Sequence, residues 1–79
     1  MKKVTVNLDS IQKVKSFVDI ISSFEYDFDL VSGRYVIDAK SLMGIFSLDL
    51  TKPIDLNIHA DEEGAAGVIR ALGPYIVKK

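Results

Sequence analysis

Apolar and polar residues alternate along three segments of the chain, and this period of two is typical of strands that bury one face. The three segments are residues 4–8, 24–30 and 54–60. A further strand is predicted over residues 34–39, where Tyr35-Val36-Ile37 follows Ser32-Gly33, a hairpin turn signal. The pattern therefore predicts four strands, of which the second and third form a hairpin.

Two segments carry the signals of helices. Apolar residues recur at positions 11, 14, 17, 18 and 21, which predicts a helix over residues 10–22 with an N-cap from Asp9-Ser10. A second, short helix is predicted over residues 42–48, with Ser41 as its N-cap. Because Gly44 inside it costs about 1 kcal/mol relative to alanine, this helix needs tertiary support.

The last third of the chain predicts one more helix. Asp61 caps it, and the acidic residues at 62 and 63 complement the helix dipole. Its buried stripe is expected from Ala65, Val68, Ile69, Leu72 and Ile76. Gly73-Pro74 interrupts the pattern, because proline lacks the backbone donor, so the helix either ends near Leu72 or continues as a kinked turn to Val77. The resulting order, β-α-β-β-α-β-α, predicts a two-layer α+β sandwich.

Composition narrows the class of protein. The 79 residues fit a single domain (residues 1–79), with 48% hydrophobic and 27% charged residues. The chain has no cysteine, which excludes disulfides, and its net charge of −1 lacks the basic excess of nucleic-acid binders. No segment approaches the roughly 20 apolar residues of a membrane span, and no signal peptide is recognised. We therefore expect a cytoplasmic protein without membrane association.

One segment resembles a known family. The run Lys40-Ser41-Leu42-Met43-Gly44-Ile45-Phe46-Ser47-Leu48 matches, nearly residue for residue, the K-S-[IL]-M-G-[VIL]-[MF]-S-L segment of Gram-positive HPr proteins. The similarity extends over about residues 17–76, and includes the acidic entry to the last helix. It implies the HPr-like open-faced sandwich, in which a four-stranded antiparallel sheet carries three helices on one face.

The resemblance also implies two functional sites, and the chain keeps only one of them. Ser41 stands where the family has a serine that a dedicated ATP-dependent kinase phosphorylates. The histidine motif G-[IL]-H-x-R-P-A is missing, and its histidine position falls on Ser10, or on Gln12 if two residues are deleted. Neither side chain can form a phosphoramidate. A glutamine there would be similar to Crh, a family member that keeps only the serine site.

The only histidine is His59, on the polar side of the fourth predicted strand. A histidine on an exposed strand face usually carries no chemistry, so we interpret it as structural rather than as a substitute phosphate acceptor. The acidic residues at positions 25, 27 and 29 are interpreted as a solvated sheet face, since they diverge from any common centre. No metal and no cofactor are expected.

The short second helix is nearly all apolar, and only part of it can face the core. Leu42, Met43 and Phe46 are predicted to dock a protein partner, with Met43 and Phe46 pointing outward. By family resemblance the partner would be the HPr kinase, a transcriptional regulator or an enzyme of the sugar phosphotransferase system. The leading hypothesis is a non-catalytic regulatory or adaptor protein. The alternatives are a true phosphocarrier with an unrecognised acceptor and a small structural interaction domain.

Overall fold

The computed structural model describes residues 1–77, and they form seven elements in the predicted order, followed by one short 3₁₀ helix. The elements are β1 (Lys2–Val6), α1 (Ile11–Ser22), β2 (Asp27–Ser32), β3 (Tyr35–Asp38), α2 (Leu42–Phe46), β4 (Ile54–His59), α3 (Glu62–Ala71) and η1 (Gly73–Tyr75).

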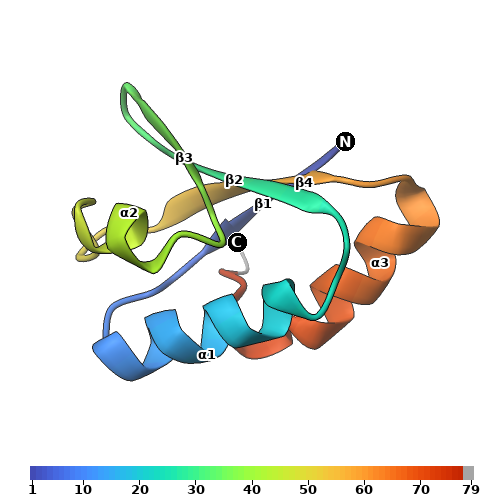
Figure 1. Cartoon of the computed structure of the whole chain (residues 1–79), viewed down its shortest axis with the longest axis horizontal. Coiled ribbons are helices and arrows are strands. Elements are labelled where there is room, and N and C mark those ends of the chain that lie inside the picture. Colours follow the sequence, from blue (N-terminus) through green and yellow to red (C-terminus); the bar gives the residue numbers. More distant parts are fainter. Residues whose placement is uncertain (78–79) are drawn as a thin grey trace.

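The four strands form one antiparallel sheet in the order β1-β4-β2-β3. Figure 1 shows the sheet with α1, α2 and α3 all on the same side of it. The predicted open-faced sandwich is therefore confirmed. The last strand in sequence, β4, lies between β1 and β2, so both of its pairings join segments that are distant in sequence.

Burial follows the period-two pattern of the strands. In β4, Ile54, Leu56 and Ile58 are buried, whereas Asp55, Asn57 and His59 face the uncovered side. The other buried residues of the core are Val6, Leu8, Val14, Phe17, Ile21, Phe28, Leu30, Ala39, Ile45, Ala65, Val68 and Leu72. All of these residues are apolar, so one continuous hydrophobic layer between the sheet and the helices holds the described residues together.

Several element boundaries differ from the sequence prediction. Leu8 is buried beyond the end of β1, and β2 begins at Asp27 rather than at residue 24. Phe24 and Tyr26 lie in the connection between α1 and β2, where their rings stack 20° from parallel. The alternation of apolar and polar residues continues past the end of a strand when every second side chain of the connection also packs against the core.

Three further differences concern the helices. Ile11 was expected on the apolar stripe of α1, but it lies in the first turn and is 63% exposed. The second helix ends at Phe46, two residues early, because Ser47 closes it with hydrogen bonds to the carbonyls of the last turn. The third helix ends at Ala71, as one of the two predicted alternatives has it, but Ile76, expected on its buried stripe, lies beyond η1 and forms a β-bridge with Val6.

The hairpin turn between β2 and β3 consists of two residues, Gly33 and Arg34. Gly33 has φ +60°, which is the left-handed conformation that a two-residue hairpin needs at its first position. The turn pairs Ser32 with Tyr35 and sets the register of the whole hairpin.

Two glycines of α3 are expected to respond oppositely to alanine. A Cβ at Gly64 would stand 2.5 Å from the Tyr26 hydroxyl oxygen, whereas a Cβ at Gly67 meets no heavy atom within 4 Å. Gly64→Ala should therefore destabilise the protein by about 1–3 kcal/mol through overpacking. Gly67→Ala should stabilise it by up to about 1 kcal/mol through helix propensity. Urea unfolding measures both, and equal shifts would contradict the packing of Tyr26 on α3.

Candidate functional site

Ser41 is the N-cap of α2, as predicted. Its backbone is extended, and its Oγ accepts a hydrogen bond of 3.2 Å from the backbone N–H of Gly44. Its carbonyl accepts the first helical bond, from the N–H of Ile45 at 3.1 Å. Ser41 is partly exposed, so this helix cap lies near the protein surface.

A tight turn after β3 delivers Ser41 to this position. The N–H of Ser41 donates to the carbonyl of Asp38 at 3.0 Å, and the N–H of Lys40 donates to the Asp38 carboxylate at 2.9 Å. Asp38 therefore binds two successive amides of the turn, that of Lys40 through its carboxylate and that of Ser41 through its backbone carbonyl, and the bond to the carboxylate is typical of aspartate in a turn.

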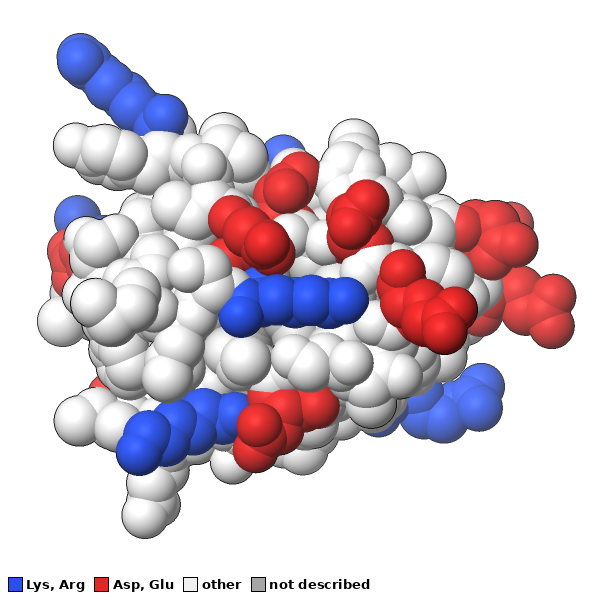
Figure 2. Space-filling model, viewed as in Figure 1, with Lys and Arg blue, Asp and Glu red and all other residues white. Residues whose placement is uncertain are grey.

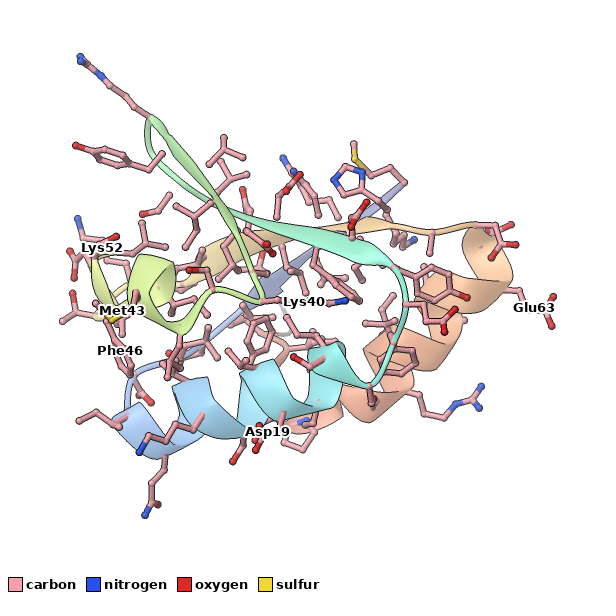
Figure 3. The ribbon with its side chains drawn as sticks, viewed as in Figure 1. Asp19, Lys40, Met43, Phe46, Lys52 and Glu63 are labelled. Carbon is pink, nitrogen blue, oxygen red and sulfur yellow. The ribbon has the colours of Figure 1, made fainter. Side chains whose placement is uncertain are left out.

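The side chain of Lys40 ties the same turn to the rest of the domain. Its Nζ donates a 2.9 Å hydrogen bond to the carbonyl of Phe24, and lies 5.4 Å from the centre of the Phe28 ring. Figure 3 labels Lys40 at the centre of this view, and on the same face Figure 2 shows acidic side chains next to basic ones. The sequence motif contains Lys40, but only the fold reveals its partner 16 residues earlier in the chain.

Packing explains how so short a helix persists. Ile45 is completely buried in the core, and a Cβ on Gly44 would stand 3.3 Å from Cδ1 of Ile37 and 3.2 Å from Oγ of Ser41. Gly44 thus lets α2 approach β3 and leaves clearance around the Ser41 hydroxyl. The destabilising effect of glycine on the helix is offset by the burial of Ile45.

The other side chains of α2 form an exposed apolar surface. Met43 is 83% exposed, and Leu42 and Phe46 are exposed to a lesser degree. Because α2 contacts α1, and because Figure 1 shows it beside the first turns of that helix, the exposed Ile11 belongs to the same end of the molecule. Figure 3 shows Met43 and Phe46 at that end. Sequence analysis missed Ile11, since helical spacing alone assigned it to the core.

The start of α1 holds the two residues proposed for the family's histidine position. Ser10 is the N-cap, and its Oγ accepts a 3.1 Å hydrogen bond from the N–H of Lys13. Gln12 lies in the first turn and is exposed. A hydrogen bond and the charge of the Lys13 ammonium, 2.9 Å away, hold the pKa of the Asp9 carboxyl below its usual value. The polar groups that surround this helix start are therefore a hydroxyl, an amide and one ion pair.

His59 lies elsewhere in the fold. Its Nε2 is 2.6 Å from the Asp29 carboxylate, and Asp27 lies directly opposite it in the sheet. The side chain is on the uncovered face, whereas α1 packs on the other. The start of α1 follows Val6, which pairs with Ile54 at one end of β4, whereas His59 is at the other end of β4. The five residue steps of strand from Ile54 to His59 correspond to about 17 Å. His59 and the start of α1 are thus not brought together.

Residues 1–77 contain no group of three or more histidine, aspartate and glutamate side chains that could hold a metal ion. Within the same residues, no helix has both the length and the apolar character needed to cross a membrane.

Comparison with known proteins identifies the architecture. Residues 10–77 match the family described as the PTS HPr component phosphorylation site. The crystal structure of HPr-C-His from Thermoanaerobacter tengcongensis is similar, with a TM-score of 0.75 and 27% identity over 94% of this chain and 89% of that chain. The histidine-containing phosphocarrier protein of Mycoplasma shares the fold, with a TM-score of 0.71 and 12% identity over 92% and 89%. No curated protein matches the chain.

Replacement of Ser41 tests its capping role. Ser41→Ala removes the acceptor for the Gly44 amide and should lower the free energy of unfolding by about 0.5–2 kcal/mol. Ser41→Asp should largely restore it, because a carboxylate accepts the same bond. Ser47→Ala is the control, since that exposed hydroxyl donates only to the carbonyl of Gly44. If all three variants were as stable as the original protein in urea unfolding, Ser41 would be an ordinary surface serine.

Proposed function

The chain belongs to the HPr family of the phosphotransferase system, and on that premise we propose that it is a member that acts through protein contacts rather than by carrying phosphate on histidine. HPr-family proteins are not enzymes themselves, but carry phosphate between enzymes. The observation that carries the proposal is the start of α1, where Ser10 is the N-cap and Gln12 is the exposed neighbour.

Phosphate transfer from histidine needs an imidazole that a partner enzyme can reach and that tolerates a doubly charged phosphoryl group. The single histidine of the chain is His59, and two carboxylates, Asp27 and Asp29, lie next to it in the sheet. Like charges at such positions repel, so a phosphoryl group on His59 would be disfavoured. The pair of His59 with Asp29 is better explained as a cross-strand contact that stabilises the sheet.

The second part of the proposal is that phosphorylation of Ser41 regulates docking. The resemblance of the segment that begins with Lys40-Ser41 to the family's K-S segment supports this role for Ser41, which is partly exposed next to Leu42 and Met43. A phosphate on Oγ retains an oxygen that can accept the Gly44 amide, while it adds a charge of about −2 beside the apolar surface. Docking of an apolar partner would then change without unfolding of α2.

The docking surface consists of Ile11, Leu42, Met43 and Phe46. Exposed methionine and aromatic side chains suit an adaptable protein interface. Protein partners are expected of the family, and the candidates are the HPr kinase, a transcriptional regulator and the enzymes of the phosphotransferase system.

Two phosphorylation reactions separate the proposal from its main alternative. Incubation with HPr kinase and ATP should add one phosphate, detected by intact mass, and Ser41→Ala should abolish it. Incubation with phosphoenolpyruvate and Enzyme I should add none. Acid-labile phosphate in the second reaction that disappears in His59→Ala would instead identify a true phosphocarrier.

Truncation of the exposed side chains tests the docking surface. Met43→Ala and Phe46→Ala should each weaken the partner by more than about 1 kcal/mol, measured by calorimetry, with thermal unfolding almost unchanged. Tyr35→Ala is a matched control, because Tyr35 is exposed but lies on β3 outside this surface. Equal affinity of the partner for all three variants would show that the interface does not include Met43 and Phe46. The helix α2 would then have only a structural role.

A further inference from the structure

The two edge strands of the sheet, β1 and β3, differ in how far other segments of the chain cover their free sides. The free side of β1 is partly covered by the end of the described chain, since the N–H of Val77 donates to Thr5 and the N–H of Asn7 donates to Tyr75, both at 2.8 Å. The strand β3 at the other edge pairs only with β2. Tyr35 and Val36 in this strand are 69% and 64% exposed. An edge strand with two adjacent exposed apolar residues is a template for pairing with another strand.

The hydrogen-bond pattern shows which backbone groups of β3 are free. The N–H of Ala39 donates to the carbonyl of Phe28 at 3.0 Å, so odd-numbered residues of this strand direct their amides toward β2. By alternation, the amides of Val36 and Asp38 and the carbonyl of Val36 point to the free edge. An incoming strand must therefore pair with the even-numbered residues.

We propose that β3 pairs with β3 of a second copy of this chain, antiparallel and with Val36 on the two-fold axis. This register joins the free groups of Val36 to those of Val36 in the other copy, and the amide of Asp38 to the carbonyl of Arg34. It also sets Tyr35 opposite Ile37 on the helix side of the sheet. The two four-stranded sheets then become one continuous sheet of eight strands.

Charge complementarity selects a second copy as the occupant. The same register places Arg34 of each copy opposite Asp38 of the other, which gives two symmetric ion pairs. Within residues 1–77 neither side chain takes part in an ion pair, and Asp38 lies opposite another carboxylate, Asp29, in its own sheet. An arginine from the second copy relieves this repulsion. Figure 1 shows the β2–β3 hairpin projecting from the body, where a second hairpin can approach it.

The association is expected to be reversible and concentration-dependent, because β3 contains only four residues and a small interface binds weakly. It should weaken as salt is added, since both ion pairs lie at the surface. Sedimentation equilibrium of the full chain up to about 1 mM should show a monomer–dimer equilibrium.

A charge exchange tests the register. Arg34→Asp and Asp38→Arg each create two like-charge pairs across the two-fold axis, so each should raise the dissociation constant by about tenfold or more. An equimolar mixture of the two variants should associate within about threefold of the original protein, because every pair across the mixed interface is then opposite in sign. A monomeric original protein at about 1 mM, or two variants that each self-associate as well as the original, would overturn the proposal.

A second measurement does not depend on the Asp38 turn, which Asp38→Arg could loosen. The chain has no cysteine, so Val36→Cys introduces a single thiol at the predicted two-fold axis. Mild oxidation should link Val36→Cys into a disulfide dimer at least about tenfold faster than the control Met43→Cys, whose position is more exposed but lies outside β3. Equal rates for the two variants would refute pairing through β3.

Discussion

One-sided burial is the constraint on which the rest of this structure depends. Every buried residue of the described chain is apolar, and together these residues form a single layer between the sheet and the helices. A chain of 79 residues supplies enough apolar surface for one such layer. All helices must therefore gather on one face of the sheet, and the other face must be polar. The five-residue helix α2 is stabilised by this layer, because its residue Ile45 is buried in it.

The turn of residues 38–41 connects the two surfaces that are proposed to bind partners. Asp38 ends the edge strand and holds the amides of Lys40 and Ser41, while Ser41 is the N-cap of α2. Lys40 fixes this turn to the carbonyl of Phe24 in the connection between α1 and β2. A charge added at Ser41 would therefore lie only three residues along the chain from the Asp38 carboxylate. Docking through α2 and pairing through β3 would share the same short segment.

The sequence predicted most of the architecture, because strands and helices in a one-layer core show clear periods. The N-caps Ser10, Ser41 and Asp61 were predicted correctly, since side-chain capping is local. The exposure of Ile11 and the hydrogen bond from Lys40 to Phe24 were not, because both depend on how distant elements pack. The strand order β1-β4-β2-β3 was not predicted, since alternation alone carries no information about which strands are neighbours. The docking role of α2 and the modification of Ser41 stay predictions.

The position of β4 between β1 and β2 has a consequence for the order of folding. Only the β2–β3 hairpin joins segments adjacent in sequence, whereas β1 must wait for a strand about 50 residues later. Loop closure over such distances slows folding relative to helical bundles of the same size. During synthesis, β1 and the hairpin emerge from the ribosome before the strand that joins them, so the two strand edges that pair with β4 stay unpaired until residue 59 has been made. Folding of the nascent chain would thus be completed late, and chaperones would have their greatest effect before that point.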